Sequence, residues 1–147
     1  MANTQSMCTS FMGELMTGTH NFTTVTGDTF KAALYLSSAT YNAATTAYGV
    51  TGEVTGTGYT AGGTTVTNGT APTTSGTSAY WTPSASFSWT GVTITTAFDT
   101  VLIYNSTQGN RAVSVHTFGA QTITAGTFTL TMPSNTTSTA LLRFATV

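Results

Sequence analysis

Charged residues are scarce in this sequence of 147 residues, which has three lysines and arginines and four aspartates and glutamates. They make up 5% of the residues, whereas an average globular protein has about 25%. Three scattered cations form no basic surface for a phosphate backbone, so we expect no nucleic-acid partner. Solubility must then depend on hydroxyl groups, and threonine stands at about 39 positions. Threonine favours strands because it is β-branched, and its hydroxyl group is hydrated on an exposed face.

Cysteine is almost absent as well. The single Cys8 excludes an intramolecular disulfide and a cysteine-based zinc site. No stretch approaches the ~18 consecutive apolar residues that span a membrane, and the N-terminus lacks the basic region and apolar run of a signal peptide. We therefore expect no membrane partner, assembly in the cytoplasm, and stability that comes from packing.

The length is typical of one domain, and no repeat, linker or low-complexity tail interrupts it, so we expect a single β-sandwich domain over residues 1–147. The clearest pattern lies at residues 100–119, where two alternating segments flank Gln108-Gly109-Asn110-Arg111 and predict an antiparallel hairpin. Further strands are expected at residues 29–36, 64–67, 79–81, 84–90, 92–98, 127–132 and 140–146. These short strands predict an all-β fold, an antiparallel β-sandwich of jelly-roll-like form with one short N-terminal helix.

One segment of the predicted fold leaves alternatives open. Residues 37–63 are rich in glycine and form either a long functional loop or a meander of short strands over residues 50–60. Trp81, Phe87 and Trp89 are expected to fill the centre of the sandwich.

The one expected helix covers residues 10–17. Thr9 or Ser10 could cap its N-terminus, and Gly18 follows its end. Nearly all of its side chains are apolar, and a helix this short needs something to pack on. Either it closes one end of the chain's own sandwich, or the N-terminal segment 1–20 is an arm or docking helix for a neighbouring subunit. The expected contact residues in the second case are Met7, Phe11, Met12, Leu15 and Met16.

No catalytic motif can be identified. His20 and His116 could form a metal or nucleophilic cluster with Cys8 or Asp99, but their spacing matches no ligand motif, and His116 is expected to be half-buried. Residues 56–61 match G-x-G-x-x-A, yet the glycines and threonines that follow cannot begin the helix of a dinucleotide site. We therefore expect no enzyme activity, no metal ion and no cofactor.

Five phrases of the sequence are distinctive and lie at residues 8–20, 27–35, 52–63, 103–106 and 110–113. Together they resemble a family of small virion proteins of tailed bacteriophages, nearly from end to end. The resemblance implies a β-rich structural protein, namely a capsid decoration or cement protein on the outer surface of the head. It also implies that the protein binds the major capsid protein, bridges capsid subunits and associates with itself as a homodimer or homotrimer. It implies no catalytic residues.

Two other functions remain open at this point. A phage tail or fibre component with a carbohydrate-binding β-sandwich would use exposed Tyr41, Tyr48 and Tyr59, and glycan binding by the isolated protein would support it. A hydrolase would depend on His116, and loss of a measured hydrolysis in His116→Ala would support that function.

Overall fold

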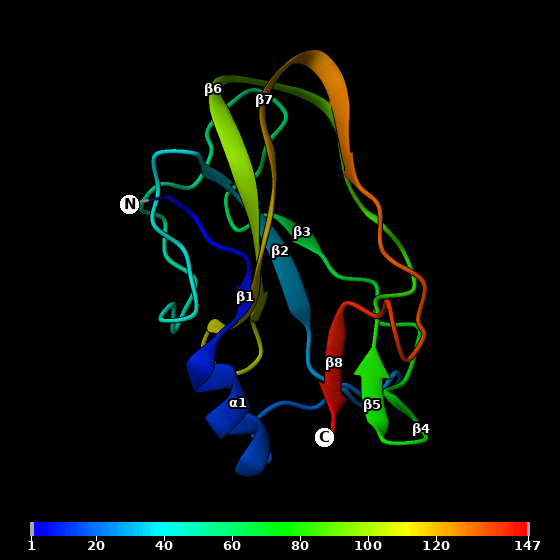
Figure 1. Ribbon diagram of the computed structural model, residues 1–147. Coiled ribbons are helices and arrows are strands. Elements are labelled where there is room, and N and C mark those ends of the chain that lie inside the picture. The colour runs from blue at the N-terminus through cyan, green and yellow to red at the C-terminus, as the bar shows by residue number, and fades with distance from the viewer. Residues whose placement is uncertain (1, 147) are drawn as a thin grey trace.

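The computed structural model describes residues 2–146. They form a five-stranded antiparallel sheet in the order β1-β7-β6-β2-β3 and a three-stranded antiparallel sheet in the order β4-β5-β8. The elements are β1 (Ser6–Met7), α1 (Thr9–Met16), β2 (Phe30–Leu36), β3 (Thr64–Thr65), β4 (Thr73–Ser75), β5 (Ser78–Trp81), β6 (Phe87–Asn105), β7 (Arg111–Leu130) and β8 (Leu142–Ala145). In Figure 1, α1 lies at the lower end of the large sheet. The predicted all-β sandwich with one short N-terminal helix is confirmed.

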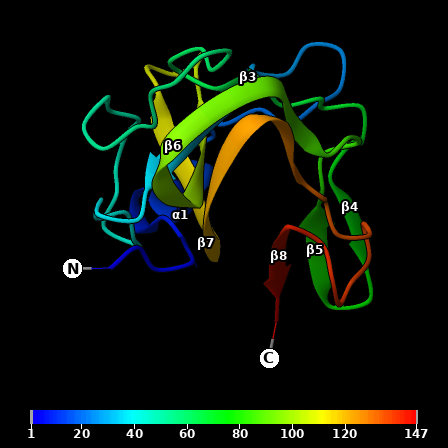
Figure 2. The same cartoon turned by 90° about the horizontal axis from the view of Figure 1, so that it is seen from above.

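The hairpin of β6 and β7 connects the two sheets. Its pairing runs from Phe87 and Leu130 at the open end to Asn105 and Arg111 beside the turn. Within the turn the predicted Gly109-Asn110 pair has φ values of 66° and 62°, the left-handed region that such turns require. Figures 1 and 2 show the hairpin arching from the large sheet across to the small one.

These two long strands replace several short ones that the sequence predicts. β6 begins at Phe87, so it includes the second half of the predicted strand at residues 84–90 and all of the one at 92–98. β7 continues through residues 119–126, where the sequence predicts no strand. Gly91, with a φ of 63°, lies in an irregularity of the β6–β7 register, and pairing resumes beyond it. A left-handed glycine bends a strand without ending it, so turn-forming residues are a poor guide to where these strands stop.

Residues 37–63, between β2 and β3, form a loop. Its strand-like pairings are isolated bridges made by Ala47, Glu53 and Thr57. The interpretation as a meander of short strands is therefore wrong. A Cβ atom at Gly56 would overlap the carbonyl oxygen of Thr93, so glycine here allows the loop to lie directly on β6. This close approach explains the first glycine of the G-x-G-x-x-A pattern.

Aromatic side chains join the two sheets in the core. Phe22 stacks on Phe30 with ring centroids 4.4 Å apart and meets the edge of Trp81 at 4.8 Å. Nearer the open end of the hairpin, Phe128 stacks on Trp89 at 5.6 Å. Both tryptophans are buried, as the sequence predicts, and so is Phe87 of β6. Burial of a side chain of this size stabilises a fold by roughly 1.5–3 kcal/mol.

Candidate functional site

Helix α1 packs against the chain's own core. Phe11 is fully buried, and its ring lies 4.9 Å from the ring of His20 and 6.0 Å from that of Phe22. Phe22 in turn contacts the aromatic groups between the two sheets. This packing agrees with the interpretation that the helix closes one end of the sandwich.

The ends of α1 agree only in part with those predicted from the sequence. The N-cap residue is Cys8, and no side chain caps the helix, so the prediction of a cap at Thr9 or Ser10 is wrong. The physical reason is that the helix begins one residue early, where the N–H group of Thr9 donates to the carbonyl oxygen of Ala43. At the other end Gly18 has a φ of 69° and terminates the helix, as the sequence predicts.

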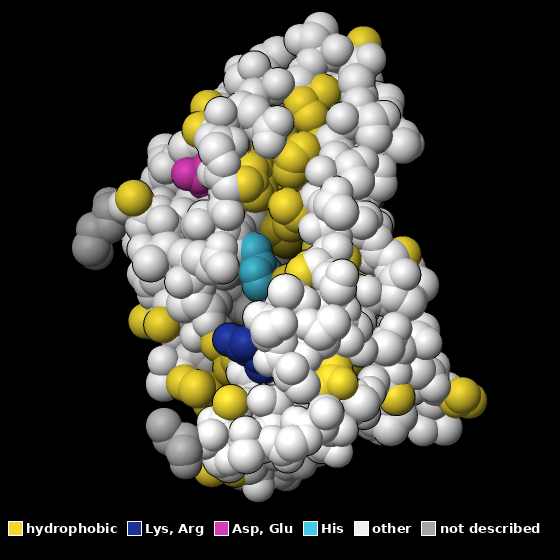
Figure 3. Space-filling view, turned by 45° about the vertical axis from the view of Figure 1, so that its right-hand side comes forward, with side chains coloured by type: hydrophobic (Ala, Val, Ile, Leu, Met, Phe, Trp, Pro, Cys, Tyr) yellow, Lys and Arg dark blue, Asp and Glu magenta, His cyan; other side chains and the backbone are white. Residues whose placement is uncertain are grey.

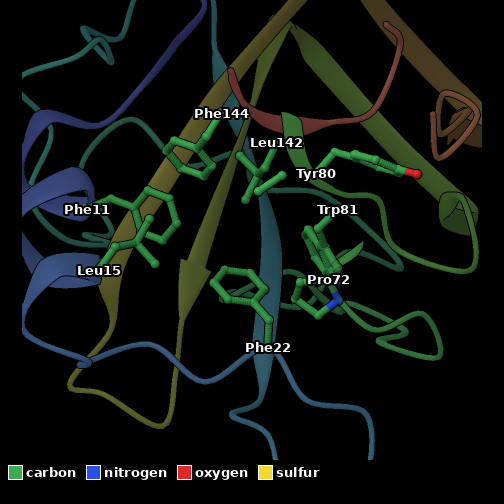
Figure 4. Close-up of a pocket in the computed structure, with 9 residues that line it drawn as sticks. Phe11, Leu15, Phe22, Pro72, Tyr80, Trp81, Leu142 and Phe144 are labelled. Atoms are coloured by element: carbon green, nitrogen blue, oxygen red, sulfur yellow. The ribbon is translucent and has the colours of Figure 1, made fainter. Parts of the chain in front are cut away.

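A cavity of about 210 Å³ lies between α1 and the small sheet. Figure 4 shows Phe11 and Leu15 of α1 on one side and Leu142 and Phe144 of β8 on another. Its lining is formed almost entirely by apolar and aromatic groups, from Phe11, Leu15, Phe22, Pro72, Ala79, Tyr80, Trp81, Leu142 and Phe144. The indole N–H of Trp81 donates to Asn68 and to the carbonyl oxygen of Thr70, so this polar group is already satisfied. A cavity of this kind suits an apolar occupant, since cavities of roughly 150 Å³ with similar linings bind benzene.

Apolar side chains reach the molecular surface beside this cavity. Met12 and Phe144 are 43% and 39% exposed, and Met16 is 86% exposed. With the partly buried Leu15 they line a second hollow, which shares Leu15 and Phe144 with the cavity. We call Met12, Leu15, Met16 and Phe144 the α1–β8 apolar surface. Contiguous exposed apolar groups mark interaction sites, so this surface is the candidate functional site.

The predicted contact residues divide into three groups. Met12, Leu15 and Met16 belong to the α1–β8 apolar surface. Phe11 is buried, so its side chain is not on any surface of the folded chain. Met7 lies in β1 and lines a different hollow. Phe144 is absent from the predicted set because its alternating neighbours in the sequence indicate only a strand.

Glu14 fixes the orientation of α1. Its carboxylate accepts a hydrogen bond from Nε2 of His20 at 2.7 Å and forms an ion pair with Arg111 at the end of the hairpin turn. Burial alone would raise the pKa of Glu14, but the hydrogen bond from His20 and the Arg111 charge outweigh it and hold this pKa below its usual value. Glu14 faces His20 and Arg111. Because residues two positions apart lie on opposite sides of a helix, Met12 and Met16 point away from His20 and Arg111.

His20 is held between two side chains. Asn105 Nδ2 donates to His20 Nδ1 at 2.9 Å and to Asp28 at 2.7 Å. The side-chain oxygen Oδ1 of Asn105 accepts hydrogen bonds from two backbone N–H groups of the hairpin turn. These bonds fix the orientation of the Asn105 side-chain amide. His20 Nδ1 therefore accepts, and the proton on Nε2 is donated to Glu14. Both ring nitrogens are engaged, so neither is free to activate a nucleophile.

The metal or nucleophilic cluster that could join the two histidines is not formed. Cys8 is fully buried, and burial together with the charge of Glu14 raises the pKa of its thiol to about 12, so it stays protonated at neutral pH. Asp99 accepts hydrogen bonds from Asn3 and Thr100, whereas the His116 ring bonds to Ser114. In the described part of the chain no three His, Cys, Asp or Glu side chains are grouped so that they could hold a metal ion.

A buried carboxylate that the sequence does not reveal organises residues 37–63. Glu53 is 7% exposed and accepts hydrogen bonds from the hydroxyl groups of Tyr48 at 2.6 Å and Tyr59 at 2.8 Å and from the N–H group of Gly62 at 2.7 Å. Burial, and then the charge of Glu53, raise the pKa of both tyrosines, so both remain donors. Tyr41 is buried and donates to backbone carbonyl groups of the same loop. The expectation of three exposed tyrosines is therefore wrong, because their hydroxyl groups have partners inside the loop.

A further hollow separates β1 from β8. Its lining includes Met7 of β1, His116 of β7 and Arg143 of β8. Figure 3 shows a histidine in a hollow, with basic side chains below it and a column of apolar side chains above it. The His116 ring forms a hydrogen bond with Ser114 Oγ at 2.9 Å. Burial lowers the pKa of His116 to about 4, so the ring is neutral at pH 7.

We expect His116 to make the protein less stable as the pH falls. The pKa is about 4 in the folded chain against an ordinary 6.5, so the unfolded chain binds more protons between these values. The contribution is complete above pH 6.5 and is lost as the pH falls towards 4, by about 1–2 kcal/mol between pH 7 and pH 5. Thermal unfolding at both pH values should show a smaller decrease for His116→Gln than for the natural sequence. Equal decreases would contradict this prediction.

Comparisons with known proteins give no relative. No protein-family model matches this chain. No curated protein and no solved structure matches it either. Within residues 2–146 no helix is long and apolar enough to cross a membrane. The function therefore has to be inferred from the site itself.

Proposed function

We propose that this protein is a bacteriophage capsid decoration or cement protein, which binds the outer surface of the head and bridges subunits of the major capsid protein. The observation that carries the proposal is the α1–β8 apolar surface, where Met16 and Phe144 are exposed beside an open apolar cavity. The resemblance of the sequence to small phage virion proteins supports the same function.

The cavity suggests how attachment takes place. A protein interface obtains most of its binding energy from a few apolar or aromatic side chains that fill pockets in the partner. The cavity of about 210 Å³ is large enough for one such side chain of the capsid protein. Around it, Met12, Met16 and Phe144 would be removed from water, at roughly 25 cal/mol per Å² of apolar area. The cavity thus serves as the anchor point and the exposed side chains as its rim.

Low charge makes this contact hydrophobic. The whole chain has three cationic and four anionic residues, too few for a strongly electrostatic interface. Attachment should therefore survive moderate salt, which screens charges but does not weaken apolar contacts. The hydroxyl-rich remainder of the surface would face solvent on the assembled particle.

The chemistry of the buried groups supports a binding role rather than catalysis. Both ring nitrogens of His20 are engaged, and the thiol of Cys8 is protonated. The tail or fibre alternative depends on exposed tyrosines, and Tyr41, Tyr48 and Tyr59 turn their hydroxyl groups into the loop instead. We therefore argue for the capsid function alone.

Charged residues on the α1–β8 apolar surface should weaken attachment without unfolding the protein. We expect Met12→Asp combined with Met16→Asp to reduce affinity for phage heads at least about 30-fold, as loss of a hydrophobic anchor of 2 kcal/mol or more would do. Val50→Asp is the matched control, because Val50 is 72% exposed in a different part of the chain. Cosedimentation with heads that lack the protein, at two salt concentrations, measures the effect.

The location on the particle provides a second test of the same proposal. A cryo-electron microscopy map of the virion should show several copies of this chain on each capsomer. Density at the tail alone, or unchanged binding of the double variant with a normal melting temperature, would contradict the capsid function. Phe11→Asp is unsuitable for this test because it places a charge in the core.

A further inference from the structure

The hollow between β1 and β8, which we call the β1–β8 hollow, separates the edges of the two sheets. It has a volume of about 310 Å³ and is lined by residues 5–7, 114–116 and 140–143. β1 is the last strand of the large sheet on this side, and β8 is the last strand of the small sheet. No strand of the described chain lies between them, so one edge of each sheet borders the hollow.

β1 and β8 run in the same direction. In Figure 1, β1 descends from the N-terminus towards α1, and the arrow of β8 also points down, towards the C-terminus. Neighbouring strands of an antiparallel sheet run in opposite directions, so two strands that flank a third run parallel to each other. The two strands are therefore oriented as the neighbours of one missing antiparallel strand.

Backbone groups of both edges face the hollow. Cys8, just beyond β1, donates its N–H group to a carbonyl oxygen of β7 at 3.0 Å, so the preceding Met7 turns its N–H and C=O groups away from β7. At β8, the N–H group of Thr146 donates to the carbonyl oxygen of Thr77 at 3.0 Å. Arg143, three residues earlier, therefore turns its backbone groups away from β5.

The side chains of Met7 and Arg143 show that one strand can pair with both residues. Met7 packs against the core, so its side chain lies on the inner face. Arg143 follows the buried Leu142 and lies on the outer face. A strand residue that pairs with Arg143 has its side chain outside, and the next residue turns its backbone to β1 and its side chain inwards, as pairing with Met7 requires. If both side chains were on one face, no single strand could pair with both.

We propose that the β1–β8 hollow binds an extended segment of another protein, which pairs antiparallel with both strands and joins the two sheets. The segment carries an acidic residue opposite Arg143 on the outer face, and the apolar residues on either side of it face the core. The Arg143 guanidinium donates through Nη1 to the carbonyl oxygens of Thr137 and Ser138, so Nη2 and Nε can bind the carboxylate.

The segment belongs to a different protein because both ends of the described chain are bound to their own fold. The side chain of Asn3 donates to the carboxylate of Asp99 at 2.7 Å, and Thr146 is bonded to Thr77. A second copy therefore offers neither of these ends to the hollow. A peptide backbone suits the site because it presents alternating donors and acceptors to both edges. This inference does not depend on the capsid function.

A synthetic peptide tests the pairing on the full chain. The probe is a short peptide with blocked ends, in which threonine and valine alternate and one central glutamate replaces a threonine. We expect it to bind and to slow the amide hydrogen exchange of Met7 and Arg143, whose N–H groups have no partner among the described residues. The same peptide with N-methyl groups on its central residues cannot donate hydrogen bonds and should not bind.

Variants of the protein test the two edges separately. Met7→Pro removes an N–H group that faces the hollow and should weaken binding of the peptide at least about 10-fold. Proline is tolerated on an edge strand where the N–H group is unpaired, so the fold should persist. Met7→Leu keeps this N–H group and is the matched control. Arg143→Glu should weaken binding of the glutamate peptide about 5-fold and favour the same peptide with a central lysine.

The exchange of charges remains informative if Met7→Pro does not fold, because Arg143 is exposed. Absence of protection at either amide, equal binding of the N-methylated peptide, or an unchanged preference for glutamate in Arg143→Glu would overturn the proposal. Self-association that protects both amides without peptide would assign the hollow to a second copy and would overturn it as well. Since only the isolated protein and a peptide are used, failure here is distinct from failure to attach to phage heads.

Discussion

Glu53→Ala should lower the free energy of unfolding by about 3–5 kcal/mol, because it leaves buried donors without an acceptor. The carboxylate accepts from Tyr48, Tyr59 and the N–H group of Gly62. The Tyr59 hydroxyl group also accepts from the N–H group of Leu34 in β2, so the same group ties the loop to the central strands. Loss of the carboxylate therefore affects residues 37–63 as a unit.

Thermal unfolding measures this effect. For a chain of this size about 1 kcal/mol corresponds to 2–4 °C, so the melting temperature of Glu53→Ala should fall by roughly 10 °C. Tyr48→Phe removes one donor and keeps the carboxylate, so we expect about 1 kcal/mol. Glu53→Gln keeps an acceptor oxygen and should lie between these two variants. A melting temperature for Glu53→Ala within 2–3 °C of the natural protein would show that the carboxylate is not a structural centre.

The role of Glu53 could not be predicted from the sequence. It stands among glycines and threonines with no periodic pattern, and its partners lie 5, 6 and 9 residues away in a loop without regular structure. Tyrosines in such a segment resemble exposed binding residues, because sequence does not indicate the direction of a loop side chain. Strand alternation, in contrast, is local, and the β6–β7 hairpin and its Gly109-Asn110 turn are therefore predictable.

The candidate site was predictable on one side only. The apolar helix residues Met12, Leu15 and Met16 can be identified from composition, but a short helix with few polar groups does not indicate which face is buried. Glu14 settles this in the structure, because its ion pair with Arg111 joins residues that are distant in the sequence. Phe144 reaches the same surface from the other end of the chain, and no local pattern indicates that approach.

Phe11→Ala should be about as damaging as loss of Glu53, at roughly 3–5 kcal/mol, because a fully buried aromatic ring is removed beside an existing cavity. The ring contacts Phe22, which stacks on Phe30 and meets Trp81, so the loss extends to the groups that join the two sheets. Met16→Ala is the matched control on the same helix. Met16 is 86% exposed, so its stability should change by less than about 0.5 kcal/mol.

Urea unfolding and amide hydrogen exchange together separate the two roles of the N-terminal helix. If α1 closes the sandwich, Phe11→Ala lowers the midpoint of the whole transition and reduces protection in β2 and β7 as well as in the helix. If the segment is an arm that is independent of the fold, only the helix amides lose protection, and the free energy of unfolding stays within about 1 kcal/mol of that of the natural protein. Met16→Ala should have the opposite effects: it should leave stability and amide protection unchanged and weaken attachment to phage heads, because it removes an exposed contact and leaves the core intact. Attachment that depends on Met16 while stability depends on Phe11 would mean that one helix closes the core with one face and binds the capsid with the other.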